Sequence, residues 1–222
     1  MRKALSTIIT FGLASALWVP SLFAQDNGRS TYWNQQETLF RTLPTSEEDI
    51  IMLGNSITDG GEWSEILSNP HIKNRGISGD TTDGILQRLG TVTKGRPAKI
   101  FLLIGTNDFS KGLSPQEIAS NIEKIICRVR CESPATELYV QSILPVSDLA
   151  PGFPDHKKHY LEIPEANQLI RKIAEKHGVT YIDLFSAFVT DDGKMDLKYS
   201  NDGLHLLGAG YSLWASLLRP YL

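Results

Sequence analysis

The sequence has only two cysteines, Cys127 and Cys131, among its 222 residues. They stand four positions apart in an amphipathic stretch that predicts a helix, so both lie on one side of it. A bridge between them would require the helix to fray near Cys131, and the closed loop would be too small to add much stability. A pair of half-buried free thiols is the alternative, and the sequence leaves both possibilities open. Neither possibility gives these cysteines a catalytic role.

Clusters of positive charge are also lacking. The chain has 22 lysines and arginines against 25 aspartates and glutamates, and Lys157 and Lys158 form only a short basic pair. A mildly acidic protein of this kind is a poor candidate for binding nucleic acid or an anionic membrane. The phosphate-binding patterns G-x-x-x-x-G-K-[ST] and G-x-G-x-x-G are absent too, which argues against a nucleotide-binding module.

Long apolar runs are confined to the N-terminus. There, two basic residues precede the apolar segment 4–19, and a proline and the small residue Ala24 follow it. This pattern predicts a signal peptide over residues 1–24; a membrane anchor is less favoured because serine and threonine dilute the run. We therefore expect an exported protein, periplasmic or secreted, with one domain over residues 25–222 and no stable membrane association once the signal is removed.

The rest of the chain alternates apolar runs with stretches of helical periodicity. The runs predict strands at 49–53, 71–75, 99–104, 137–144 and 179–182. Helices are predicted at 30–44, 63–67, 82–89, 115–130, 162–177 and 209–218. Runs such as "IIML" and "IFLLI" are apolar on both sides, which suits parallel strands covered by helices on each face. We predict an α/β fold, a three-layer α/β/α sandwich around a five-stranded parallel sheet.

One long irregular segment, 145–160, interrupts this pattern. It is rich in proline, glycine, histidine and lysine. Loops of this length are commonly functional or disordered, and this one could form the rim of a pocket. His156 and His159 lie in it, and contact of either with a substrate is the less favoured interpretation of their position.

Small and polar residues follow the predicted strands. Ser56 comes directly after the first strand, Gly76 after the second and Asn107 after the third, while Asp202 and His205 stand just before the last helix. Ligands of open parallel sheets bind beyond the carboxyl ends of the strands. We therefore expect these five residues to lie along one edge of the sheet.

This set of residues is complete for acyl transfer. A serine hydroxyl is a weak nucleophile unless a base removes its proton, and a neutral histidine whose tautomer is fixed by a carboxylate is such a base. Ser56, His205 and Asp202 would fill these roles. The oxyanion that forms during the reaction needs donors held in place beforehand. The backbone N–H groups of Ser56 and Gly76 and the side-chain amide of Asn107 would supply them.

Each of these residues also has a plainer interpretation. Ser56 and Asp202 could simply cap helices, His205 could be an exposed histidine, and Gly76 and Asn107 could be turn residues. Their occurrence together favours the catalytic interpretation. Several neighbouring residues are expected only in turns and caps, namely Asp59, Gly60, Asp80, Thr81 and Asp108. Others are expected in the core, namely Trp63 and the helix face formed by Leu213, Trp214, Leu217 and Leu218.

Four short motifs resemble those of a known family, the SGNH hydrolases or GDSL-like esterases and lipases. They are "LGNSIT" at 53–58, "NRGISGDTT" at 74–82, "GTND" at 105–108 and "DGLH" at 202–205, in the order that the family has them. The resemblance implies a flavodoxin-like fold and no metal or organic cofactor. It also implies that Ser56 is the nucleophile and an oxyanion donor, that Gly76 and Asn107 are the other donors, and that His205 is the base oriented by Asp202.

One position departs from the family's namesake motif, because Asn55 stands where that motif has an aspartate before the serine. This variant resembles the branch related to platelet-activating-factor acetylhydrolase and to bacterial carbohydrate and sialate O-acetylesterases. We therefore expect a serine esterase that removes short acyl groups, above all acetyl, from a small-molecule or glycan ester. A lysophospholipase or thioesterase with the same triad and an inactive carbohydrate-binding protein are the alternatives.

Overall fold

A computed structural model describes residues 28–222, so the predicted signal peptide, residues 1–24, lies outside the described part of the chain. Five strands form one sheet: β1 Ile50–Gly54, β2 Ile72–Gly76, β3 Lys99–Leu103, β4 Glu137–Gln141 and β5 Thr180–Ile182. Their order across the sheet is β2-β1-β3-β4-β5, and every neighbouring pair is parallel. The predicted five-stranded parallel sheet is confirmed.

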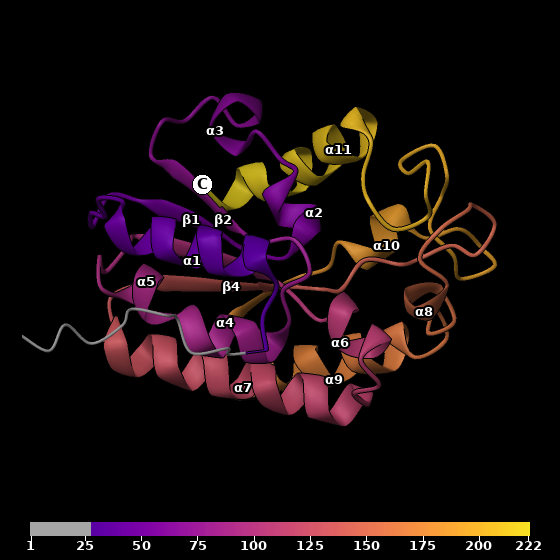
Figure 1. The fold of residues 1–222 in the computed structure, drawn as a ribbon, viewed down its shortest axis with the longest axis horizontal. Helices are drawn as coiled ribbons and strands as arrows, with labels where there is room; N and C mark the ends of the chain where they lie inside the picture. Colours follow the sequence, from indigo (N-terminus) through magenta and orange to yellow (C-terminus); the bar gives the residue numbers. More distant parts are fainter. Residues whose placement is uncertain (1–27) are drawn as a thin grey trace, which may run out of the picture.

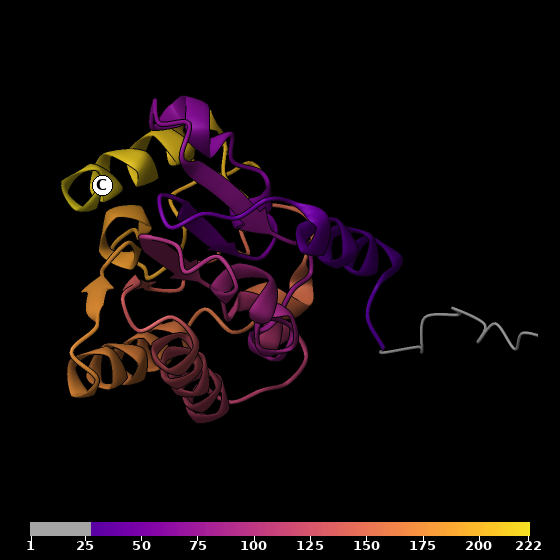
Figure 2. The ribbon, with the colours of Figure 1, turned by 90° about the vertical axis from the view of Figure 1, so that its left-hand side faces the viewer.

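Helices cover both faces of this sheet (Figure 1). They are α1 Thr31–Thr42, α2 Ser56–Asp59, α3 Trp63–Ile66, α4 Thr82–Arg88, α5 Gly90–Thr93, α6 Thr106–Ser110, α7 Pro115–Glu132, α8 Pro154–Lys157, α9 Ile163–Lys176, α10 Phe185–Phe188 and α11 Gly208–Leu218. One apolar cluster joins the sheet to α4, α7 and α9, and a second joins it to α3, α10 and α11. The end-on view in Figure 2 shows the resulting three layers, as predicted.

The side chains of β1 divide between the two layers. Ile51 and Leu53 belong to the cluster with α4, α7 and α9, whereas Ile50 and Met52 belong to the cluster with α3 and α11. All five residues of the strand are buried. Successive side chains of a strand point to opposite faces, so a run that is apolar throughout can be buried on both.

The direction of the chain across the sheet reverses at β1. The chain passes from β1 to β2 on one side and then crosses to β3 on the other. Such a reversal opens a crevice beyond the carboxyl ends of the two central strands. Ser56 follows β1 and Asn107 follows β3, so this topology brings them to neighbouring positions at the same edge.

The structure differs from the predicted elements in two ways. The strand predicted over 137–144 ends at Gln141, because the N–H of Ile143 bonds to the side chain of Asn167 instead of a neighbouring strand. The helices α2, α5, α6, α8 and α10 were not predicted. Each has only four or five residues, too few for an apolar period to be visible.

Two surface predictions need correction. The helical spacing of Trp33, Leu39, Phe40 and Leu43 predicts one apolar face for the first helix, but Leu39 is 46% exposed, whereas Glu37 is buried. Cys127 and Cys131 are free thiols and both are exposed rather than half-buried. Within residues 28–222, no helix combines the length and the apolar character needed to cross a membrane.

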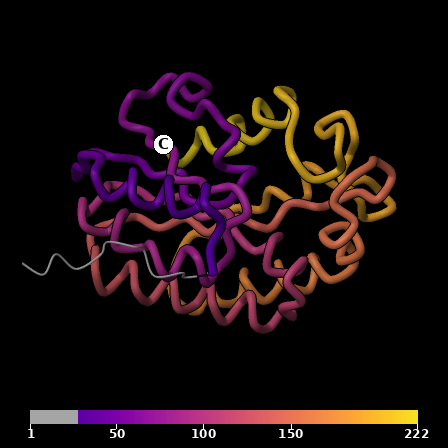
Figure 3. The backbone as a smooth tube through the Cα atoms, viewed as in Figure 1, coloured from indigo at the N-terminus to yellow at the C-terminus, as the bar shows by residue number. Residues whose placement is uncertain are grey.

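Two long segments meet beyond the carboxyl ends of the strands, at the right in Figure 3. The segment 145–160 and the segment 189–205 are joined by the hydrogen bond from Ser147 N–H to Gly203 O, 2.8 Å, and by the ion pair of Lys194 with Asp148, 2.7 Å. The irregular segment found in the sequence therefore lies against the segment that carries Asp202 and His205.

Candidate active site

The turn between β1 and α2 presents Ser56 beyond the end of the sheet. Gly54 fits there only as glycine, since a Cβ atom would lie 2.2 Å from Thr58 Oγ1 and 2.4 Å from Leu103 O. Asn55 caps α2 by accepting a hydrogen bond from Ile57 N–H, 3.1 Å. The following residue, Ser56, is therefore the first of the helix and is partly exposed.

Three predicted residues from distant parts of the chain form one hydrogen-bonded series. Ser56 Oγ lies 3.0 Å from His205 Nε2, and His205 Nδ1 lies 2.8 Å from Asp202 Oδ2. The side chains of His205 and Asp202 are 32% and 26% exposed, so the series borders on solvent. In this arrangement the imidazole can take a proton from the serine hydroxyl, and the carboxylate holds the imidazole in the required orientation.

The carboxylate of Asp202 is fixed on both oxygens. Oδ1 accepts the backbone N–H groups of Leu204 and His205, each at 2.8 Å, while Oδ2 faces the imidazole. Partial burial of the carboxyl favours its neutral form, but the hydrogen bonds from His205 and Leu204 outweigh this effect and lower the pKa of Asp202. Asp202 is therefore ionised and can only accept hydrogen bonds.

Asn107 lies near this series with its side chain held from two directions. It is a residue of α6 and is only 7% exposed. Its Nδ2 donates to Asp80 O at 2.7 Å, and its Oδ1 lies 2.9 Å from His156 Nε2. Since an amide nitrogen carries two hydrogens, one N–H of Asn107 is left for another acceptor.

Gly76 does not fit the predicted role of an oxyanion donor. Its N–H already donates to Asn74 Oδ1 at 2.8 Å. A Cβ atom at Gly76 would lie 2.2 Å from Asp59 N, so glycine is needed there because the backbone of α2 approaches closely. The role of Gly76 is therefore one of packing.

Gly79 is the better candidate for that donor. It is exposed, and its φ of +79° turns the chain in a way that strains other residues. Within residues 28–222 no acceptor bonds its N–H, and it directly precedes Asp80, whose carbonyl holds Asn107. Gly79 is the second glycine of the motif "GISGD", so the motif contains it. The sequence alone cannot show which of the two glycines has an N–H without an acceptor.

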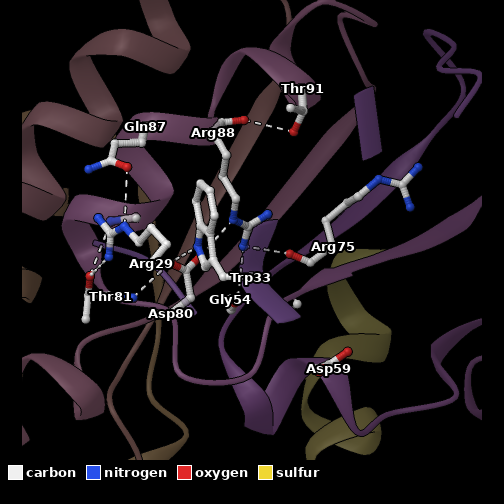
Figure 4. A network of polar contacts seen from close by, with 12 residues as sticks. Arg29, Trp33, Gly54, Asp59, Arg75, Asp80, Thr81, Gln87, Arg88 and Thr91 are labelled. Carbon is white, nitrogen blue, oxygen red and sulfur yellow. Dashed lines mark hydrogen bonds and ion pairs between the residues drawn. The ribbon is translucent and has the colours of Figure 1, made fainter. Parts of the chain in front are cut away.

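A buried ion pair supports the chain beneath the site (Figure 4). Arg88 Nε lies 2.7 Å from Asp80 Oδ2, and both side chains are fully buried. Arg88 also donates to Gly54 O at 3.0 Å and to Arg75 O at 2.9 Å, and Trp33 Nε1 donates to Asp80 Oδ1 at 2.8 Å. The pair therefore joins the ends of β1 and β2 to the turn that holds Asn107.

Asp108 is a second buried carboxyl beside the site. Its oxygens accept the N–H of Thr82 at the start of α4, at 3.1 Å. Burial raises the pKa of Asp108 to about 6, although the hydrogen bonds from Thr82 oppose the rise. Asp80 and Asp108 were expected to be simple turn and cap residues. Asp108 does bond the first N–H group of α4, but from the distant helix α6, and Asp80 in addition pairs with Arg88 and accepts a hydrogen bond from Asn107.

The segment 145–160 supplies a residue that the sequence did not single out. The ring of Phe153 stands edge-on to the ring of His205 at 5.0 Å, and His156 contacts Asn107. His159 lies elsewhere, stacked on Phe109 at 5.5 Å and bonded to Glu162 at 2.8 Å. Only the folded arrangement distinguishes the two histidines. Trp63, by contrast, packs on Trp214 in the core as predicted.

A metal site is not visible in residues 28–222, which hold no group of three or more histidine, cysteine, aspartate or glutamate side chains able to bind an ion.

Comparisons with known proteins agree with this arrangement. The family model described as GDSL-like lipase/acylhydrolase matches residues 52–213. Subunit alpha2 of platelet-activating factor acetylhydrolase IB from Rattus norvegicus is 27% identical over 209 residues, which cover 91% of this chain and 86% of that protein. The Homo sapiens subunit alpha2 gives the same identity and coverage.

Solved structures share the fold. A Streptococcus pneumoniae protein provisionally named as a platelet activating factor superposes with a TM-score of 0.77 at 30% identity, covering 86% of this chain and 92% of that one. A catalytic mutant of the acetylxylan esterase from Geobacillus stearothermophilus superposes with a TM-score of 0.62 at 16% identity, covering 79% and 94%, which supports the fold alone. Because the family model spans most of the described residues, the chain belongs to the GDSL-like lipase/acylhydrolase family.

Proposed function

We propose that this acylhydrolase removes short acyl groups, above all acetyl, from a carbohydrate-type ester through an acyl intermediate on Ser56. The observation that carries the proposal is the series from Ser56 Oγ through His205 to Asp202, with contacts of 3.0 and 2.8 Å. Such a series is the arrangement that makes a serine hydroxyl nucleophilic at neutral pH.

The reaction follows from these contacts. Ser56 Oγ attacks the ester carbonyl carbon as its proton passes to His205 Nε2, and the imidazolium is stabilised by Asp202. The tetrahedral intermediate collapses, the C–O bond to the alcohol breaks, and the alcohol leaves with that proton. Water then attacks the acyl-serine while His205 takes one of its protons. The bond from Ser56 Oγ to the acyl carbon breaks as His205 returns that proton to Oγ, and the carboxylic acid is released.

The negative charge on the intermediate requires donors at fixed positions. We assign this role to the backbone N–H groups of Ser56 and Gly79 and to the free N–H of Asn107. Among residues 28–222, neither backbone N–H has an acceptor. One donor of this kind is worth ~10² to 10³ in rate, so the set is a large part of the catalysis.

The preference for a short acyl group has two supports. The ring of Phe153 stands edge-on to His205 at 5.0 Å, so a large side chain lies beside the proposed base. The similar mammalian subunits, 27% identical over 91% of this chain, are named as acetylhydrolases. We propose a glycan ester rather than a nucleic acid or membrane as partner. We also propose export through residues 1–24 to the periplasm or the exterior.

A lipid ester is the second candidate. Four large apolar side chains are exposed on the segments around the site: Leu149, Phe153, Leu197 and Leu207, with exposed fractions from 38% to 68%. Such residues could contact the alkyl chain of a phospholipid, and the related subunits are named for platelet-activating factor. This candidate keeps the same triad and changes only the alcohol or acyl part of the ester.

The test is a pair of serine variants assayed with p-nitrophenyl acetate. Ser56→Ala should lose activity by several orders of magnitude because no nucleophile remains. Ser216→Ala changes an exposed serine on α11 and should retain the wild-type rate. If Ser56→Ala retains most of the rate, the proposed function is wrong. An undetectable rate in the wild type itself would favour the inactive carbohydrate-binding alternative.

Substrate class is decided by a panel assayed with the wild type. Acetylated xylo-oligosaccharides, a 2-acetyl phospholipid, and p-nitrophenyl acetate, octanoate and laurate should be compared by kcat/KM. Preference for acetate and the acetylated sugars supports the glycan proposal. Preference for octanoate or laurate, or for the phospholipid, would favour the lipid candidate.

A further inference from the structure

One histidine of the segment 145–160, His156, contacts the candidate oxyanion donor Asn107 and has no role in the proposed mechanism. We propose that His156 is a positioning residue of the oxyanion hole: its Nε2–H donates to Asn107 Oδ1 and thereby fixes the amide that binds the oxyanion. The inference rests on the proposed function and names a residue that acts through Asn107 without touching the substrate.

The two contacts of Asn107 define the orientation of its amide. His156 Nε2 lies 2.9 Å from Oδ1, and Asp80 O lies 2.7 Å from Nδ2. A flipped amide would set an N–H against the N–H of His156 and a carbonyl oxygen against the carbonyl of Asp80. Both contacts would become repulsive, so the pair of partners selects the orientation that leaves one N–H of Nδ2 for the oxyanion.

This arrangement requires the neutral Nε2–H tautomer of His156. The other ring nitrogen, Nδ1, is buried, and the described residues supply no partner for it. A proton on Nδ1 would therefore create a buried donor without an acceptor. Burial lowers the pKa of His156, and repulsion from His205 when His205 carries a proton acts in the same direction, so the neutral ring is favoured.

Contacts on both sides of His156 hold the backbone that carries it. Phe153 has a φ of +53°, and its ring stands edge-on to His156 at 5.9 Å and to His205 at 5.0 Å. Lys157 is buried, and its Nζ donates to Ala150 O and Pro151 O at 2.8 and 2.9 Å. These contacts close the segment on itself and present His156 to α6.

The expected size of the effect follows from the donor that His156 holds. Loss of the Asn107 donor should lower kcat by ~10² to 10³. Loss of His156 leaves the donor present but free to rotate, so His156→Leu should lower kcat by roughly tenfold to a hundredfold. KM should change little, because the interaction strengthens only as charge develops on the oxygen.

The experiment measures kcat and KM with p-nitrophenyl acetate for His156→Leu, His156→Gln and the control His159→Gln. The amide nitrogen of glutamine can occupy nearly the position of Nε2, so His156→Gln should restore most of the rate. His159→Gln, on the same segment but bonded to Glu162, should stay within about twofold of the wild type. Melting temperatures identify any variant that fails to fold.

A double-mutant cycle separates positioning from a general structural role. His156→Leu should lower kcat in the wild type but have no further effect when Asn107 is already alanine. Equal loss in both backgrounds, or an unchanged kcat in folded His156→Leu, would overturn the inference. These outcomes are distinct from failure of the proposed function, which Ser56→Ala tests: an inactive Ser56→Ala together with an unchanged His156→Leu contradicts only the role of His156.

Discussion

At the scale of single residues, Asp202 shows how orientation is built into the candidate triad. One oxygen faces His205 Nδ1 and the other accepts two backbone N–H groups, so the carboxylate has little freedom to turn. Gly203 makes this loop possible: its φ is +77°, and a Cβ atom there would lie 2.1 Å from Ser147 O. The aspartate is thus held in place by its own loop and by the segment packed against it.

The substitution Asp202→Asn should lower kcat by about 10³ to 10⁴, because an amide can donate to Nδ1 and stabilise the wrong imidazole tautomer. The measurement is kcat with p-nitrophenyl acetate at pH 7. Asp196→Asn is the control, since Asp196 pairs with the exposed side chain of Lys198 on the neighbouring surface. A kcat for Asp202→Asn within tenfold of the wild type would contradict the role assigned to the carboxylate.

At the scale of elements, the one-turn helix α2 depends on β2 for its position. Asn74 Nδ2 of β2 lies 3.0 Å from each of the carbonyl oxygens of Thr58, Asp59 and Gly61, which share its two hydrogens. Gly76 lets the same helix approach the strand backbone directly. A helix of four residues has little stability of its own. The position of Ser56 therefore depends on these tertiary contacts.

The substitution Gly76→Ala should destabilise the fold and move the nucleophile. The added Cβ would lie 2.2 Å from the backbone nitrogen of Asp59, so backbone must shift, at a cost of about 1 to 3 kcal/mol. Gly90→Ala is the matched control: a Cβ there meets nothing within 4 Å and the residue is helical, so stability should hold or rise by up to ~1 kcal/mol. Urea denaturation measures both. Equal stability of the two variants would refute the argument.

At the scale of the whole molecule, two buried carboxyls differ in how their charge is balanced. Asp80 is paired with Arg88, which also bonds the ends of two strands. Asp108 accepts the N–H and hydroxyl of Thr82 and forms no ion pair among the described residues, and its pKa is raised to about 6. Folding therefore takes up a proton on Asp108 between about pH 3.8 and pH 6, which makes stability depend on pH in that range.

The sign of this dependence follows from the raised pKa. Between the ordinary value of 3.8 and about 6, the folded state binds the proton of Asp108 more tightly than the unfolded state does. The stabilisation that protonated Asp108 gives the folded state is therefore fully present below pH 3.8 and is lost as pH rises through 6. Its upper limit is ~3 kcal/mol, because a pKa difference of one unit corresponds to about 1.4 kcal/mol. Near pH 5 about half of it should remain.

The measurement is the free energy of unfolding in urea at pH 5 and pH 7.5 for the wild type and for Asp108→Asn. The other carboxyls titrate in both proteins, so their contribution cancels in the comparison. The wild type should gain stability relative to Asp108→Asn at pH 5. An identical difference between the two proteins at both pH values would show that Asp108 does not titrate in this range.

Much of the fold could be predicted because the longer elements carry their own pattern. The run at β1 is buried on both faces, as a continuous apolar strand predicts, and α7 repeats apolar residues at helical spacing over 18 residues. The short helices α2 and α6 could not be found in this way. The side-chain cap of Asn55 and contacts with β2 hold α2, whereas hydrogen bonds of Asn107 and Asp108 with the segment around Asp80 and Thr82 hold α6.

In the candidate site, too, some residues could be predicted from the sequence and others could not. Ser56, Asn107, Asp202 and His205 were predicted from motifs at strand ends, and the structure brings their side chains to one edge. The choice between Gly76 and Gly79, and between His156 and His159, could not be made from the motifs. Each choice depends on which backbone N–H or imidazole already has a partner, and that partner comes from a distant part of the chain.

The sequence by itself determined the parallel sheet, its two helical layers and the polar residues at the strand ends, because apolar periodicity and turn chemistry act over a few neighbouring residues. Only the tertiary structure decided that Ser56 and His205, separated by 149 positions, lie 3.0 Å apart and that His156 holds Asn107. The physical reason is that hydrogen bonds are satisfied by proximity in space, and packing of the whole chain sets that proximity.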